Sequence, residues 1–152
     1  DAVITGAIEE VYRARTGHIE DSLVMRPFPR ANPDEVVRQR LWEDYRQDLI
    51  SAAGICLVVL GNKRVDGQIV SASGVRREYE IARQHGLNVV PLGATGYMAN
   101  EIWSEMSSTF DAHYPNAKAD LREQFSRLGE AVEKPAELIS RTLEFVGLIS
   151  KE

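Results

Sequence analysis

The feature that most constrains this fold is an uninterrupted apolar run at residues 55–60, which Gly61 and Asn62 close. The run contains three β-branched residues and no alternation of apolar with polar side chains. A strand of this kind is covered on both faces, as in parallel sheets. A second apolar run, at 87–92, is interrupted only by Asn88. The two runs predict neighbouring strands of a parallel α/β sheet.

Segments with helical periodicity alternate with these runs. Residues 2–12 have apolar side chains at helical spacing, so the sequence starts inside or at the edge of a helix. A second helix is expected to run from Pro33, with Asn32 as its N-cap, to Gly54. Apolar or aromatic residues recur in it at every fourth position: Val37, Leu41, Tyr45 and Leu49. A strand is expected between these two helices, at 18–25.

The rest of the chain continues the alternation. A polar loop through Asp66 and Gly67 leads to a helix for which Ser73 is the expected N-cap and Gly86 the end. Another helix is expected at about 98–106. Two amphipathic helices follow, with these apolar residues turned toward the sheet: Leu121, Phe125, Leu128, Leu138, Leu143 and Leu148. The order β-α-β-α-β-α predicts a doubly wound, Rossmann-like parallel sheet with helices on both faces.

The bulk properties limit the classes of function. The 152 residues fit one domain, 1–152. A net charge of -5 argues against a general nucleic-acid binder, which usually has a basic face. No apolar stretch approaches the roughly 18 to 20 residues that span a bilayer, and residues 1–4 lack the basic start of a signal peptide. With Cys56 as the single cysteine, we expect a cytoplasmic protein without disulfides or a cysteine-based metal site.

Ligands of open parallel sheets bind outside the carboxyl ends of the strands. Three segments of small residues are expected there: Gly61, Asn62 and Lys63; Ser73 and Gly74; and Gly93, Ala94, Thr95 and Gly96. Small residues permit close backbone approach, and helix N-termini present free N–H groups to an anion. Each segment taken alone is more often a simple turn. Their convergence on one edge of the sheet favours a binding site for a phosphate-bearing ligand.

Four charged residues are candidates for contacts with such a ligand. Lys63 follows a buried strand, which places its ammonium at the mouth of the crevice. Arg46 lies on the preceding helix, and Glu78 lies just over one turn into the helix that starts at Ser73. Arg26 ends the expected strand at 18–25 and is followed by a proline. Singly, each of these is more often a solvated surface residue.

The sequence contains few residues or motifs that indicate catalysis. The chain has three histidines, and none of them has the spacing of a metal-ligand pair. His85 is expected at a helix C-terminus, where a cation interacts well with the helix dipole. The sequence contains no nucleophile elbow, Walker loop or G-x-G-x-x-G motif. We therefore expect a binding domain with no catalytic residues, no metal and no cofactor.

Several motifs in order resemble the SLOG superfamily. They are residues 26–29, 42–46, 61–63, 72–78, 91–99 and 102–103, and the likeness extends over most of the chain. The most similar branch is the one attached to Sir2-type NAD-hydrolysing domains, which forms the sensor half of the effector in Thoeris anti-phage defence. In this branch the residues at Arg46, Lys63 and Glu78 contact the ligand.

The resemblance implies a function in concrete terms. A TIR-domain enzyme makes a cyclic ADP-ribose isomer, the SLOG domain binds it, and a linked Sir2-like domain begins to degrade NAD. Arg46 and Lys63 would neutralise the pyrophosphate, and Glu78 would accept hydrogen bonds from ribose hydroxyls. The resemblance also implies that strands and a glycine-rich loop precede this sequence, which would make it a fragment of a longer, homo-oligomeric protein.

Departures from the family keep two alternatives open. Phosphoribohydrolases that resemble lysine decarboxylases carry Pro-Gly-Gly-x-Gly-Thr-x-x-Glu where this chain has only the outline, with Val75 in place of the threonine. The missing hydroxyl favours binding over turnover. A phosphoribohydrolase acting on nucleoside monophosphates, with Glu78 as its acid, is the first alternative. The second is an assembly module with a vestigial pocket.

Overall fold

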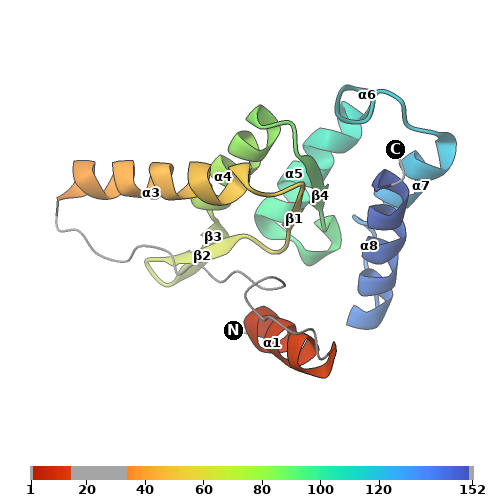
Figure 1. Cartoon of the computed structure of the whole chain (residues 1–152), viewed down its shortest axis with the longest axis horizontal. Helices are drawn as coiled ribbons and strands as arrows, with labels where there is room; N and C mark the ends of the chain where they lie inside the picture. The colour runs from red at the N-terminus through yellow and green to blue at the C-terminus, as the bar shows by residue number, and fades with distance from the viewer. Residues whose placement is uncertain (1, 15–33, 151–152) are drawn as a thin grey trace. The chain divides into compact units, whose positions relative to one another are not determined.

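The computed structural model describes residues 2–14 and 34–150 (Figure 1). The chain divides into two compact units, Asp1–Tyr45 and Arg46–Glu152. The strand expected at 18–25 and the candidate ligand contact Arg26 lie outside the described residues. None of the described helices is long and apolar enough to cross a bilayer.

The first unit contains α1 (Ala2–Ala14) and the start of α3 (Glu35–Ser51). The expected helix at the start of the sequence is confirmed by α1. The cap of α3 differs from the expected Asn32. The Asp34 Oδ1 atom accepts hydrogen bonds from the N–H groups of Val36 at 2.9 Å and Val37 at 3.1 Å. The N-cap is therefore Asp34, because its carboxylate satisfies two of the N–H groups that a helix start leaves without intrahelical acceptors.

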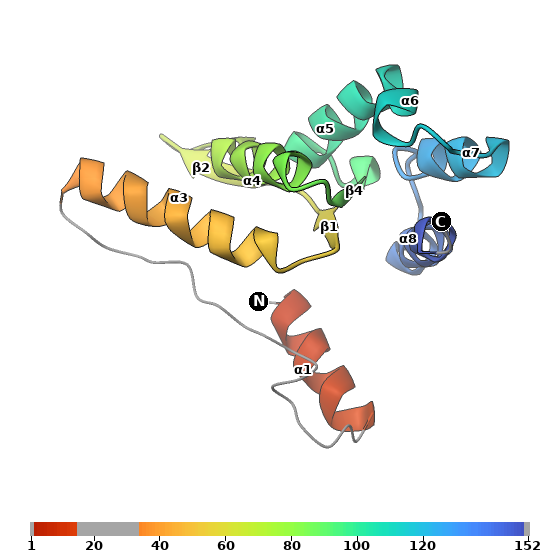
Figure 2. The same cartoon turned by 45° about the horizontal axis from the view of Figure 1, so that its top comes forward.

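The second unit is built on a parallel pair of strands. β1 (Ile55–Val58) pairs with β4 (Asn88–Pro91), from Ile55 opposite Asn88 to Val58 opposite Pro91. The crossover between them contains α4 (Ser73–Gln84), which packs against both strands. Figures 1 and 2 show α4 and α5 (Tyr97–Ser108) beside this pair. The α/β fold with parallel strands is thus confirmed, with two parallel strands among the described residues.

The polar loop expected after β1 is instead an antiparallel hairpin. It consists of β2 (Asn62–Val65) and β3 (Gln68–Ser71), joined by Asp66 and Gly67. Both turn residues have positive φ, 49° at Asp66 and 82° at Gly67. That conformation belongs to the type I′ turn, for which Asp-Gly is a preferred pair. The loop prediction missed this signal because the flanking residues are too polar to suggest a strand.

Helices complete the second unit after β4. The short 3-10 helix η1 (Gly93–Thr95) leads into α5, and the expected helix at 98–106 is confirmed with one or two extra residues at each end. Three helices follow: α6 (Phe110–His113), α7 (Ala119–Arg127) and α8 (Pro135–Ile149). The one-turn α6 is absent from the sequence prediction because four residues are too few to show a period.

The core of this unit includes an aromatic cluster contributed by α6, α7, α8 and the residue after α6. It comprises Phe110, Tyr114, Phe125 and Phe145, whose ring centroids lie 5.2 to 6.1 Å apart. The inward position expected at Leu143 is wrong, because that side chain is 67% exposed. The buried stripe of α8 runs instead through Leu138, Thr142, Phe145 and Ile149. Leu143 follows Thr142 and is therefore turned about 100° away from the stripe.

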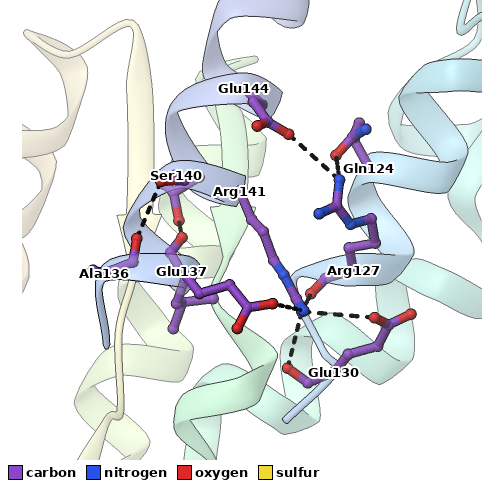
Figure 3. A network of polar contacts seen from close by, with 10 residues as sticks. Gln124, Arg127, Glu130, Ala136, Glu137, Ser140, Arg141 and Glu144 are labelled. Atoms are coloured by element: carbon purple, nitrogen blue, oxygen red, sulfur yellow. Dashed lines mark hydrogen bonds and ion pairs between the residues drawn. The ribbon is translucent and has the colours of Figure 1, made fainter. Parts of the chain in front are cut away.

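A buried arginine joins α8 to the end of α7 (Figure 3). The Arg141 Nη1 atom donates hydrogen bonds to the carbonyl oxygens of Arg127 at 2.7 Å and Glu130 at 3.3 Å. Its Nη2 atom lies 2.6 Å from Glu137 Oε1, one turn earlier on α8. Carbonyls at a helix C-terminus lack intrahelical donors. Arg141 therefore closes the end of α7 and fixes the corner that leads to α8.

Candidate functional site

Parallel pairing puts the carboxyl ends of β1 and β4 at the same edge of the sheet. A single hydroxyl ties these two ends together. The Thr95 Oγ1 atom accepts a hydrogen bond from the Leu60 N–H at 2.8 Å and donates one to the Leu92 carbonyl at 2.7 Å. The Leu60 carbonyl in turn accepts the Ala99 N–H of the first turn of α5 at 3.0 Å. The edge at which a ligand is expected is therefore a fixed framework.

Arg46 and Glu78 meet at this edge although 32 residues separate them. The Arg46 Nε atom lies 3.4 Å from Glu78 Oε1, and the Arg46 side chain is only 12% exposed. Burial raises the pKa of Glu78, and the charge and hydrogen bond of Arg46 offset part of that effect. The carboxyl group is thus half-buried and held by one arginine.

The start of α4 receives the Arg46 guanidinium. A Cβ atom at Gly74 would lie 2.9 Å from Arg46 Nη2, which is closer than such atoms approach. Glycine at this position therefore permits the arginine to lie against the first turn of the helix. Its Nε atom reaches Glu78 while Nη2 lies at the helix start, so one guanidinium serves both places.

Lys63 reaches the same helix start from the hairpin. Its Nζ atom donates a hydrogen bond to Ser73 Oγ at 3.2 Å. The N-cap of α4 is Ala72 and makes no side-chain cap, so the expected capping role of Ser73 is wrong. Ser73 is the first helical residue, and its hydroxyl is turned to the lysine. Lys63 and Arg46 thus lie against two consecutive residues, Ser73 and Gly74.

The charges at the start of α4 favour the binding of an anion. The N–H groups of a first helical turn have no intrahelical acceptors and carry the positive end of the helix dipole. Two cationic side chains are added to it here, with the Glu78 carboxylate on the same helix one turn later. The Glu101 carboxylate lies nearby, where it accepts a hydrogen bond from the Ser71 hydroxyl. Such a helix start can hold a phosphate group.

The glycines nearest the strand ends have packing roles. Gly61 has a φ of +77°, and a Cβ there would lie 2.8 Å from the Cβ of Met98. A Cβ at Gly93 would lie 2.7 Å from Cγ of Trp103. Gly96 also has a φ of +77° but has open space where its Cβ would be. Gly61 and Gly93 therefore let elements pack closely at this edge, as well as shaping its loops.

The remaining candidate residues make contacts that hold the loops at this edge of the sheet. Asn62 is the first residue of β2 and pairs with Ser71. The Ala94 N–H donates to the Leu128 carbonyl at 2.8 Å. Together with the Thr95 hydroxyl, these contacts hold the loops in place. The structure brings Arg46, Lys63, Ser73, Gly74 and Glu78 together, whereas residues 93–96 line the same edge with their polar groups largely used.

Three features of this region were not expected from the sequence. Cys56 of β1 lies near Glu78, and burial followed by that negative charge raises the pKa of its thiol to about 11. The thiol is consequently neutral near pH 7.

Leu60 and Tyr97 have positive φ values of 58° and 52°, a conformation uncommon for residues other than glycine. No sequence pattern marks those two positions. Within the described part of the chain, no group of three or more metal-ligating side chains is gathered.

Comparison with known proteins identifies the family. The model of the Sir2- and TIR-associating SLOG family matches residues 1–149. This chain is a member of that SLOG family. The resemblance inferred from the motifs at Lys63 and Glu78 is thereby confirmed.

The curated relatives of this SLOG chain are longer proteins. It is 38% identical to the NAD(+) hydrolase ThsA of Acinetobacter baumannii, over 98% of this chain and 32% of the relative. The ThsA proteins of Cytobacillus dafuensis and Bacillus cereus are 38% and 36% identical, over 95% and 97% of this chain. The chain spans about a third of the length of these relatives.

Proposed function

We propose that this SLOG domain is a regulatory sensor that binds a cyclic ADP-ribose isomer and controls NAD hydrolysis by a linked Sir2-like domain. The observation that carries the proposal is the meeting of two cations and one carboxylate at the start of α4. Arg46 and Lys63 lie against Gly74 and Ser73, and Glu78 is on the same helix one turn later. The ligand combines a diphosphate with ribose hydroxyls, and these groups need that combination of charges.

Each side chain has a separate role in this proposal. The diphosphate occupies the first turn of α4, where backbone N–H groups and Lys63 donate to its oxygens. Arg46 donates to the diphosphate through its Nη atoms and keeps Nε on Glu78. The Glu78 carboxylate accepts hydrogen bonds from ribose hydroxyls. Arg46 therefore orients the acidic group as well as binding the anionic one.

The proposed link between ligand binding and NAD hydrolysis is based on the relatives. Proteins named NAD(+) hydrolase contain this domain as about a third of their length. A sensor acts only if its ligand binds better in one arrangement of the protein than in another. We place the domain in a cytoplasmic homo-oligomer, in which ligand-bound SLOG domains favour the active arrangement of the Sir2-like part.

Calorimetry with cyclic ADP-ribose isomers tests the proposal. We expect binding by the wild-type chain and a loss of about 10- to 100-fold in affinity in Arg46→Ala and in Glu78→Ala, since each removes a charged hydrogen bond. Arg122→Ala on α7 is the matched control, because Arg122 pairs with Asp111, away from α4. An absence of heat from every isomer, or equal binding in all three variants, contradicts the proposal.

One observation favours a phosphoribohydrolase as the second candidate. The pKa of Glu78 is raised by burial, and a carboxylic acid that keeps its proton nearer to neutral pH is suited to general acid catalysis. Incubation with AMP distinguishes the two functions. Release of adenine that Glu78→Gln abolishes assigns the enzyme, whereas calorimetric binding of cyclic ADP-ribose isomers without base release assigns the sensor.

A further inference from the structure

A second polar cavity lies at the opposite end of β4 from the proposed sensor site. Its volume is about 180 Å³, and residues from the end of α4, the start of β4 and α6 line it. Three of these carry the polar groups that matter here: Arg83, Asn88 and His113. Because β4 separates this cavity from the loop at Gly93, it is a different site from the one at the start of α4.

Two carboxylates, Glu80 and Glu105, interact with arginines of α4 near this cavity. Arg76 Nη1 lies 2.6 Å from Glu105 Oε2, and Tyr79 donates its hydroxyl proton to Glu105 Oε1 at 3.1 Å. The Tyr79 oxygen also takes a hydrogen bond from Arg83. Glu80 is shared between Arg76 and Arg77.

Arg83 is left with a surplus of positive charge. Among the described residues no ion pair joins it to a carboxylate; the Glu105 charge acts on it from a longer distance, and the Tyr79 hydroxyl lies between them. The C-terminal end of α4 offers a partial negative charge, which offsets only part of a full cation. The guanidinium therefore faces the cavity without full neutralisation.

His113 lines the same cavity and responds to this charge. Its Nε2 atom lies 3.2 Å from Thr109 Oγ1. Burial lowers the pKa of His113, the charge of Arg83 lowers it further, and Glu105 opposes both effects. Tyr114, which follows α6, also lines the cavity, but its hydroxyl donates to the Val89 carbonyl at 2.8 Å. The lowered pKa keeps the imidazole neutral near pH 7, while Arg83 lines the same cavity and makes no ion pair with a described carboxylate.

We propose that this cavity binds a compact oxyanion between Arg83 and His113, with the Asn88 amide as a third donor. An oxyanion would complete the charge balance of Arg83 and let His113 take a proton, which adds a second charged donor. A volume of about 180 Å³ accommodates a tetrahedral oxyanion or a small carboxylate but not a nucleotide. The site is therefore independent of the proposed cyclic ADP-ribose site.

The test uses sulfate as a tetrahedral probe whose charge is constant over the pH range, and acetate as a carboxylate probe. The ring resonance of His113, assigned with His113→Gln, is titrated by NMR in the whole chain. We expect sulfate to raise the pKa of His113 and to bind at least about threefold more tightly near pH 5.5 than near pH 7.5. Chloride at equal ionic strength is expected to have no such effect. A larger response to acetate than to sulfate assigns the site to carboxylates.

Variants make the outcome decisive. Arg83→Gln should lose the sulfate effect on His113 and bind about tenfold more weakly, because the charged donor is gone. Its side chain is exposed, so the variant is expected to keep its melting temperature. Arg122→Gln removes an exposed arginine on α7 and should respond as wild type does. An equal response in Arg83→Gln, or an equal response to chloride, overturns the proposal.

Discussion

The substitution Gly74→Ala separates ligand binding from stability. The new Cβ would lie 2.9 Å from Arg46 Nη2, about 0.6 Å inside an ordinary contact of about 3.5 Å. The guanidinium must move by about that amount. Movement away from Glu78 lengthens the 3.4 Å contact to about 4 Å, which is too long for a hydrogen bond and at the limit of an ion pair. Arg46 is then displaced both from the helix start and from its carboxylate.

Two effects of this substitution on stability oppose one another. The Glu78 side chain is 40% exposed, so solvent screens the pair and its loss costs less than about 1 kcal/mol. Replacing glycine by alanine in a helix gains up to about 1 kcal/mol. We therefore expect the free energy of unfolding to change by less than about 1 kcal/mol. Affinity for the cyclic ADP-ribose isomer should fall by about 10- to 100-fold, because one charged hydrogen bond is lost.

Urea denaturation and calorimetry on the same preparation measure the two quantities. Gly147→Ala is the matched control, because Gly147 is within α8 and has open space where its Cβ would be. That variant should gain stability and keep its affinity. If Gly74→Ala binds as tightly as wild type, Arg46 does not contact the ligand from the start of α4, and the reasoning fails.

Three further predictions concern single groups. Burial raises the pKa of Glu78, so the folded chain holds this proton more tightly than the unfolded chain does. The free energy of unfolding should therefore fall as pH rises from the ordinary glutamate pKa through the raised one. In urea denaturation, Glu78→Gln should lack this pH dependence. Thr95→Val leaves the Leu60 N–H without its acceptor and should cost about 1–3 kcal/mol, which Thr95→Ser largely restores. Arg141→Leu removes the donors to the carbonyls at the end of α7 and should cost about 1–3 kcal/mol in thermal or urea unfolding, against less than about 1 kcal/mol for Arg122→Leu.

The sequence predicted the scaffold where a pattern repeats. The apolar runs at 55–60 and 87–92 identified β1 and β4 and their parallel arrangement, because strands buried on both faces need continuous apolar residues. The sequence did not predict features that depend on only a few residues. The hairpin after Gly61 has one Asp-Gly turn and polar strands, and the exposure of Leu143 follows from which of two apolar stripes of α8 meets the core.

The candidate site also combines features that the sequence predicted with features that it did not. No periodicity relates Arg46 to Glu78, since tertiary packing brings them together. Their positions made each of them a candidate, and the family motifs implied that they contact one ligand. The residues expected to cradle phosphate at Gly61 and Gly93 prove to allow close packing against Met98 and Trp103. A glycine that shapes a loop and a glycine that admits a neighbouring side chain look identical in a sequence.

The indole of Trp103 is enclosed by two glycines from different parts of the chain. A Cβ at Gly93 would lie 2.7 Å from Cγ, and one at Gly129 would lie 2.2 Å from Cε2. The indole N–H also donates to the Phe125 carbonyl at 3.0 Å. The loop after β4 and the corner that Arg141 holds consequently bear on opposite parts of one rigid ring. Neither the loop nor the corner can shift without displacing the indole or opening a void, so the packing of Trp103 couples the carboxyl edge of the sheet to the corner between α7 and α8.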